Sequence, residues 1–113
     1  MLIFKILTAE QWGALEREGF TDGAPVDLAD GFIHFSTAAQ LAETAAKHFA
    51  GQNGLMLVAV DSDSVDDALK WEPSRGGDLF PHLHRTLYGA EVLWCKPMPL
   101  TPRGHSIPPE AQP

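Results

Sequence analysis

The sequence predicts a small α+β domain with a split mixed β-sheet and two main helices. Two short apolar runs, at residues 2–7 and 31–36, are each followed by a Thr-x-x-Gln sequence and a stretch with helical spacing. A third apolar run, LMLVAV at residues 55–60, has the length and composition of a buried strand. The chain has 113 residues, which fits a single domain, and we assign residues 1–100 to it.

The first unit is predicted to be a strand followed by a helix. Residues 2–7 read LIFKIL, which is short, apolar and typical of a buried strand. Thr8 and Gln11 form a capping-box pattern, so the helix should run from about residue 9 to residue 18. Gly19 is suited to the left-handed position that ends a helix. Residues 20–30 are rich in Gly, Pro and Asp, and they are predicted to be a loop.

The second unit repeats this order. Residues 31–36 are predicted to be a strand, and Thr37 with Gln40 provides a second capping box for a helix that extends toward Gly51. Lys5 and His34 each lie three residues before the capping threonine of their unit. Each strand therefore carries one polar side chain at the same offset from a helix N-terminus.

The second half of the chain gives weaker signals. Ser64 is predicted to cap a short helical turn, and residues 71–81 are predicted to be a loop. Residues 90–96 alternate moderately well and indicate a final strand. Residues 101–113 are rich in proline and poor in large apolar side chains, so we expect a disordered tail.

The charge distribution excludes several classes of protein. The net charge is −7, and the eight Lys and Arg residues are scattered rather than gathered in a basic stripe, which disfavours generic nucleic-acid binding. The apolar run at the N-terminus is too short for a signal peptide or a membrane-spanning helix, and it lacks the pattern of a signal peptide. The single cysteine, Cys95, cannot form an intrachain disulfide and fits a reducing compartment. We therefore expect a cytoplasmic protein without a membrane partner, and the oligomeric state stays open.

Residues 71–78 suit the binding of an anion. Arg75 stands next to Gly76 and Gly77, so a guanidinium and backbone N–H groups could hold a phosphate. A surface turn with an ion pair between Glu72 and Arg75 is the structural alternative. Glu72 follows a tryptophan, and a carboxylate against an aromatic ring can act as an acid or a base.

Three histidines are candidates for a functional site. His34 interrupts an apolar strand, where it is either a structural residue or a group that binds a ligand or transfers a proton. His82 and His84 have the His-x-His spacing that places two rings on one face of a strand. Together with His34 they could hold a metal, but no nearby Asp or Glu spacing supports that, and we expect no metal.

The chain resembles a small bacterial family, domain of unknown function 952. The resemblance is carried by IFKIL, GFIHFST, KHFAGQ, LMLVAVD and KWEPSRGGDLFPHLH, in the same order and spacing over residues 2–100. This family is in turn similar to the ADP-ribosyltransferase superfamily, which implies an ADP-ribosyltransferase-like fold and a ligand of nucleotide size. In that comparison GFIHFST resembles the segment that stacks nicotinamide, with His34 at the stacking position, and Lys5 stands at the polar position of the first strand.

The resemblance implies a nucleotide-binding enzyme that acts on NAD, ADP-ribose or an RNA phosphate, with NAD as the candidate cofactor. A non-catalytic binding or regulatory module and a His-based metalloenzyme are the alternatives. The residues expected to do acid, base or orienting work are His34, Glu72 and His82. The residues expected to bind the ligand and its phosphate are Lys5, Ser36, Arg75, Gly76, Gly77 and His84.

Overall fold

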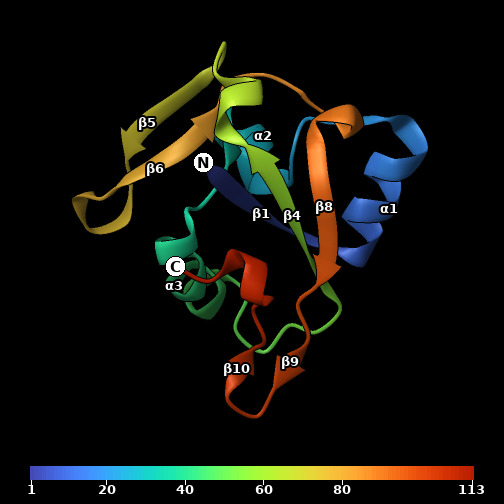
Figure 1. Cartoon of the computed structure of the whole chain (residues 1–113), viewed down its shortest axis with the longest axis vertical. Coiled ribbons are helices and arrows are strands. Elements are labelled where there is room, and N and C mark those ends of the chain that lie inside the picture. The colour runs from blue at the N-terminus through green and yellow to red at the C-terminus, as the bar shows by residue number, and fades with distance from the viewer.

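The computed structural model describes residues 1–113, apart from the side chain of Arg75 (Figure 1). The elements follow in the order β1 (Leu2–Thr8), α1 (Ala9–Glu18), β2 (Phe20–Thr21), α2 (Pro25–Asp30), β3 (Ile33–His34), α3 (Ala38–His48), β4 (Leu55–Asp61), η1 (Ser62–Val65), β5 (Leu69–Pro73), η2 (Arg75–Gly77), β6 (Leu79–Leu83), β7 (Leu87–Tyr88), η3 (Gly89–Glu91), β8 (Val92–Pro97), β9 (Leu100–Thr101), β10 (Gly104–His105) and η4 (Pro109–Ala111).

The sheet is split into two three-stranded parts, as the sequence predicts. The first sheet has the strand order β1-β4-β8, and the second has the order β3-β6-β5. The sequence predicts a mixed sheet, whereas the strand pairs within both of these sheets are antiparallel. Two shorter antiparallel pairs, β2 with β7 and β9 with β10, are also present.

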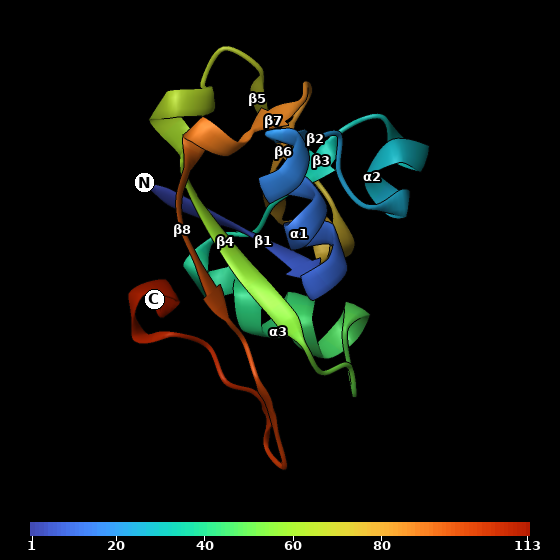
Figure 2. The same ribbon diagram turned by 90° about the vertical axis from the view of Figure 1, so that its right-hand side faces the viewer.

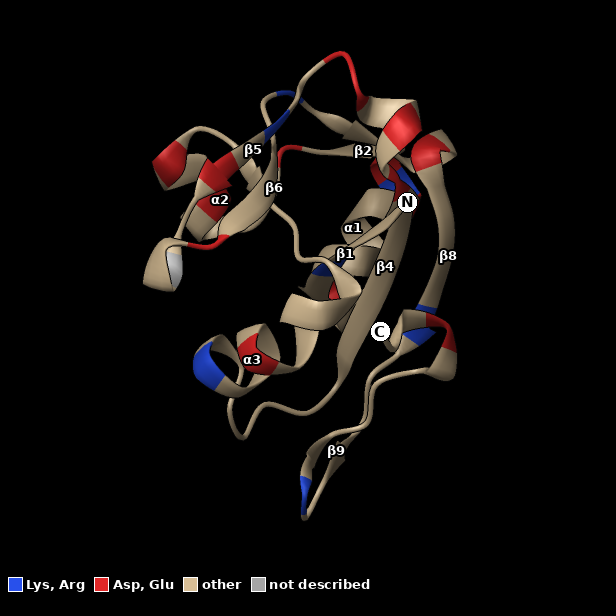
Figure 3. Ribbon diagram, turned by 60° about the vertical axis from the view of Figure 1, so that its left-hand side comes forward, with Lys and Arg blue, Asp and Glu red and all other residues tan. Residues whose placement is uncertain are grey.

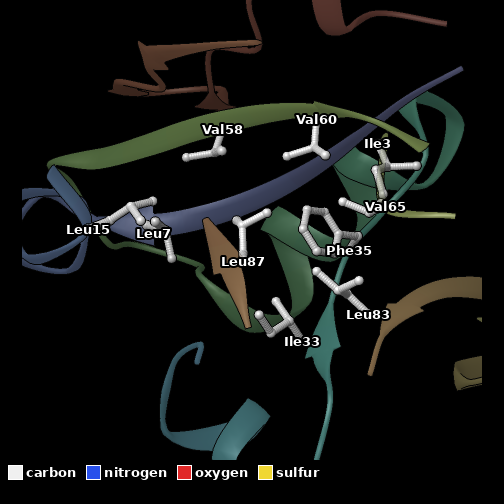
Figure 4. Packing of buried hydrophobic residues seen from close by; sticks show 10 residues of the cluster. All are labelled: Ile3, Leu7, Leu15, Ile33, Phe35, Val58, Val60, Val65, Leu83 and Leu87. Atoms are coloured by element: carbon white, nitrogen blue, oxygen red, sulfur yellow. The ribbon is translucent and has the colours of Figure 1, made fainter. Parts of the chain in front are cut away.

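Strands β1 and β4 of the first sheet are buried on both faces, because each alternates two sets of apolar side chains. One set meets α1 and the second sheet and forms the cluster drawn in Figure 4. The members of that cluster are Ile3, Leu7, Leu15, Ile33, Phe35, Val58, Val60, Val65, Leu83 and Leu87. The other set includes Phe4, Ile6 and Leu57 and meets Leu41 and Ala45 of α3, which lies against this face of the sheet (Figure 2).

Both predicted helices form at the predicted capping boxes. The backbone N–H of Gln11 donates to Thr8 Oγ1 at 3.1 Å, and the N–H of Thr8 donates back to Gln11 Oε1 at 2.9 Å. Thr37 and Gln40 exchange the same pair of hydrogen bonds at the start of α3. Gly19 ends α1 in the left-handed conformation, with φ of +79°.

A third helix, α2, lies in the segment that the sequence predicts to be a loop. Pro25 occupies the first turn, where a missing N–H costs nothing, and Gly31 ends the helix at φ +85°. The carboxylate of Asp27 accepts the N–H of Ala24 at 2.7 Å, which closes the first turn. The six-residue helix escaped detection because it is too short to show an apolar period.

The prediction of a loop at residues 71–81 is also wrong. This segment contains the end of β5, the turn η2 and the start of β6, which form a hairpin. Pro81 lies in the central strand of its sheet, a place where proline is uncommon, and this composition hid the strand. The predicted strand at residues 31–36 is shorter than expected, because only Ile33 and His34 belong to β3.

The C-terminal segment carries regular structure. Residues 101–113, which the composition predicts to be disordered, contain part of the β9–β10 hairpin and the turn η4. Ala111 is fully buried against the α3 side of the first sheet, together with Met98, which lies just before this segment. Among the described residues, no helix is long and apolar enough to cross a membrane.

Candidate functional site

A cavity of about 580 Å³ opens where the two sheets meet. A pair of backbone hydrogen bonds forms a β-bridge between the two sheets. Phe4 N–H donates to Ser36 O at 2.8 Å, and Ser36 N–H donates to Phe4 O at 2.9 Å. Lys5 follows Phe4 directly, and His34 precedes Ser36 by two residues. The bridge therefore brings the polar side chains of the two strand–helix units to one cavity, which both of them line.

The cavity has aromatic walls and basic side chains. Phe35, Phe49 and Phe80 supply apolar surface. The ionisable side chains that line it are Lys5, Asp30, His34, His48 and His82. Among the described residues, one lysine, three histidines and the carboxylate of Asp30 line this cavity, and the buried carboxylate of Asp27 lies directly behind Lys5 and His34. Such a lining favours an anionic ligand that also presents a flat or apolar part.

Asp27 of α2 connects Lys5 to His34. The Lys5 ammonium donates to Asp27 Oδ2 at 2.7 Å, and His34 Nδ1 lies 2.6 Å from Asp27 Oδ1. The backbone N–H of His34 also donates to Oδ1 at 3.0 Å. Including the N–H of Ala24, four donors surround a carboxylate whose side chain is fully buried. This satisfies the requirement that a buried charge be paired and hydrogen-bonded.

These contacts decide the charge of Asp27. Burial alone would raise the pKa of the carboxyl group, but the hydrogen bond from His34 and the charge of Lys5 outweigh it and lower the pKa to about 2. For Lys5 the balance is reversed, because burial lowers the pKa of the ammonium while Asp27 raises it. At neutral pH, Asp27 is therefore a carboxylate.

His34 lies between two carboxylates of α2. Its Nδ1 faces Asp27, and its Nε2 lies 3.0 Å from Asp30 Oδ2. The Nδ1 contact is a hydrogen bond with Asp27, and the Nε2 contact is a close approach to Asp30. The two carboxylates of α2 therefore hold the His34 ring in place at the cavity that it lines.

His82 lies opposite His34, because the two residues are register partners in the β3–β6 pair. Their ring centroids are 5.2 Å apart. His82 Nδ1 lies 3.0 Å from Glu72 Oε1, and His84 Nε2 lies 2.7 Å from the same oxygen. Phe32 packs against all three imidazole rings, with centroid distances of 4.6, 4.2 and 5.0 Å to His34, His82 and His84 respectively.

The pKa values of Glu72 and His82 are both lowered, but by different effects. The hydrogen bonds from His84 and His82 lower the pKa of the partly exposed Glu72 carboxyl group. Burial lowers the pKa of His82, and the hydrogen bond to Glu72 opposes that change. His82 is thus favoured as a neutral ring whose Nδ1–H donates to Glu72.

The structure brings together part of the residue set that the sequence suggests. Lys5, His34, Ser36 and His82 line the cavity, whereas Glu72 and His84 pack behind His82. The side chain of Arg75 lies outside the described part of the structure.

The two glycines of η2 do not line this cavity. Gly76 and Gly77 have φ of +70° and +85°. The N–H of Gly77 already donates to Ser74 O at 2.9 Å. One of the backbone N–H groups that the sequence predicts to bind an anion is therefore already engaged in a hydrogen bond within the turn.

Sequence reasoning missed Asp27, Asp30, Phe32 and His48. Asp27 and Asp30 stand three residues apart, on one face of a helix, and proline two residues before Asp27 is the signal that could have revealed that helix. Phe32 and His48 carry no comparable signal. Among the described residues, no group of three or more His, Cys, Asp or Glu side chains is arranged to hold a metal ion.

Comparisons with known proteins give a family and a fold. The family model described as "Protein of unknown function (DUF952)" matches residues 6–95. The crystal structure of protein CC0527 from Caulobacter crescentus is 47% identical, with a TM-score of 0.89 over 95% of this chain and 94% of that one. The solution NMR structure of CC0527 is 48% identical, with a TM-score of 0.84 over 93% and 90%. No curated protein matches the chain.

Proposed function

This chain belongs to the DUF952 family, and on that premise we propose that it is a nucleotide-binding enzyme of ADP-ribosyltransferase-like type. The observation that carries the proposal is the described part of the cavity lining, which combines aromatic walls with one lysine and three histidines in an acidic protein. NAD, ADP-ribose and an RNA 2′-phosphate are the candidate ligands.

The cavity suits a ligand of this size and chemistry. Its volume of about 580 Å³ falls within the range of roughly 300–1,000 Å³ typical of small-molecule sites. Phe35, Phe49 and Phe80 would pack against a base or nicotinamide ring. Lys5 and Ser36 would bind oxygens of a phosphate or ribose, because both side chains line the same cavity.

His82 would carry out the proton transfer. It borders the cavity, and Glu72 holds its Nδ1–H at 3.0 Å, so its Nε2 is the atom that would accept a proton from an attacking hydroxyl group or water. His34, whose ring centroid lies 5.2 Å from that of His82, would orient or stack the ligand in the same cavity. Glu72 would act through His82, as an orienting group.

A non-catalytic binding module is the second candidate, and one observation favours it. The sequence predicts Glu72 as an acid, base or orienting residue of the site, but Glu72 lies outside the cavity lining and accepts hydrogen bonds from two histidines. A chain that kept the cavity without a carboxylate at the reacting bond would bind the nucleotide and leave it intact.

Amide NMR shifts during titration with NAD, ADP-ribose and a 2′-phosphorylated dinucleotide test the proposal. We expect at least one of these ligands to shift the resonances of Lys5, His34 and His82. If none of the three does so, the ligand proposal is overturned.

Turnover then separates the enzyme from the module. With the ligand that binds, His82→Gln should lower the rate about 100-fold or more while binding persists. His105→Gln, on β10 and outside the cavity lining, should turn over like the natural protein. Recovery of the ligand unchanged after long incubation with the natural protein would favour the binding module.

A further inference from the structure

Helix α2 has its polar and apolar sides reversed relative to an ordinary surface helix. Asp27 is 1% exposed, whereas its neighbours Val26 and Leu28 are 55% and 63% exposed. A surface helix normally buries its apolar side chains and presents its charges to water. Figure 3 shows acidic residues along α2. The helix is therefore held to the protein by its carboxylates, so its placement serves Asp27 rather than the apolar core.

Lys5 is the counterpart of this carboxylate. It lies between Ile3 and Leu7 on β1, and these two residues belong to the apolar cluster on its face of the strand. Its side chain is 8% exposed, and it lines the cavity. An ammonium has three donors, and among the described residues Asp27 Oδ2 is its hydrogen-bonding partner. The remaining donors are available to acceptor atoms of a ligand.

We propose that Asp27 is a positioning residue that keeps Lys5 an ammonium ion directed at the cavity, and that an anionic group of the ligand binds at this ammonium. The inference deepens the proposed function and rests on it for the ligand site. It adds the residue that maintains the charge at Lys5, and it restricts the group bound there to an anionic one.

The surrounding groups support this assignment. Asp27 is the charged group that α2 presents to Lys5, at 2.7 Å. The other ionisable groups that line the cavity, among the side chains that the structure describes, are His34 on β3, His48 on α3, His82 on β6 and Asp30 on α2. Burial lowers the pKa of Lys5, and Asp27 is the opposing influence. Without Asp27, a lysine this deeply buried would lose its proton more readily.

The first experiment uses no ligand. The Lys5 side-chain carbon shifts are followed by NMR against pH in the natural protein and in Asp27→Asn. We expect the titration midpoint of Lys5 to fall by roughly one to three pH units in the variant. An unchanged midpoint in folded Asp27→Asn would overturn the inference, whatever nucleotide the protein binds.

Substitutions at two glycines, one as the test and one as its control, replace Asp27→Asn if that variant does not fold. A Cβ at Gly23 would lie 2.5 Å from Asp27 Oδ2, and the backbone there has φ of +106°. Gly23→Ala should therefore displace the carboxylate without removing its charge and lower the Lys5 midpoint. Gly31→Ala, at the other end of α2, shares the backbone strain with φ of +85° but meets nothing within 4 Å. It should leave the midpoint unchanged, and equal midpoints in both variants would contradict the positioning role.

The second experiment uses inorganic pyrophosphate as the probe. At pH 8 we expect Lys5→Met and Asp27→Asn to weaken binding at least tenfold, and Asp27→Asn to recover part of the loss at pH 6, where Lys5 regains its proton. Binding that is equal in Lys5→Met and in the natural protein would overturn the anion site at Lys5. A lowered Lys5 midpoint without nucleotide binding would instead refute the proposed function and leave the role of Asp27 intact.

Discussion

Asp27 shows how one residue joins parts of the chain that are distant in sequence. Its two oxygens accept from the backbone of Ala24 and His34 and from the side chains of Lys5 and His34. A lone aspartate in a segment rich in Gly, Pro and Asp reads as a turn residue, so its role follows from tertiary structure alone. Lys5 and His34 were detectable, because a charge or an imidazole is unusual inside an apolar strand.

The low pKa of Asp27 predicts a loss of stability in acid. The pKa is about 2 in the folded protein and 3.8 in the unfolded chain, so the folded state binds fewer protons between these values. Its contribution, about 2 kcal/mol, is complete above pH 4 and is lost as the pH falls from about 4 to 2. Urea unfolding across this range measures it.

Two variants provide the comparison for acid unfolding. Asp27→Asn should lose less stability than the natural protein between pH 4 and pH 2, although it starts from a lower value because it leaves Lys5 and His34 without their carboxylate. The exposed Asp63→Asn should follow the natural protein. Parallel curves for Asp27→Asn and the natural protein would contradict the assigned pKa.

A second residue-scale prediction concerns His82. The Glu72 carboxylate raises the pKa of this imidazole against the effect of burial. Glu72→Ala should therefore lower the pKa of His82 further and release its Nδ1 proton to either ring nitrogen, which nitrogen-15 shifts of the ring report. Asp66→Ala, at an exposed position, should change neither quantity. A higher pKa of His82 in Glu72→Ala would refute the contact.

At the scale of elements, side chains that cap a helix were the most informative sequence signals. The boundaries of α1 agree with the prediction because Thr8, Gln11 and Gly19 act locally, through hydrogen bonds and backbone conformation. The β5–β6 hairpin was missed because its strands are stabilised by pairing with each other and with β3, which local composition does not report. Proline and glycine in the hairpin then favoured a loop.

The cap of α3 provides the element-scale prediction. Thr37→Ala removes the acceptor for the Gln40 N–H and should destabilise the protein by about 1 kcal/mol. Thermal unfolding measures the change. Ala46→Ser, on an exposed position of the same helix, should stay within about 0.5 kcal/mol of the natural protein. An equal effect of both variants would mean that the capping hydrogen bond contributes nothing.

At the scale of the whole molecule, the chain forms one compact body. Its Cα radius of gyration is 13.0 Å, close to the value of roughly 13 Å for a single domain of this size. The split sheet was predictable, because two strand–helix units and a third strand fix the class of fold. The cavity was not, because it depends on the two hydrogen bonds between Phe4 and Ser36, which are separated by 32 residues, that join the sheets.

The C-terminal segment provides the whole-molecule prediction. Ile107 and Ala111 pack on the cluster that also contains Met98, so deletion of residues 104–113 should expose part of it. We expect a loss on the order of 1–3 kcal/mol, seen as a lower midpoint of urea unfolding. Deletion of residues 112–113 alone is the control and should have little effect. An unchanged midpoint in the longer deletion would show that the segment contributes no stability, as a disordered tail would.

The reversed faces of α2 have a practical consequence. Leu28 is 63% exposed, so a cysteine placed there would be open to reagents. Burial raises the pKa of the natural thiol, Cys95, to about 11, which leaves it almost entirely protonated and slow to react at neutral pH. Leu28→Cys would therefore accept a thiol-directed fluorophore with high selectivity. The dye would report, in real time, whether α2 moves when a small molecule enters beside it.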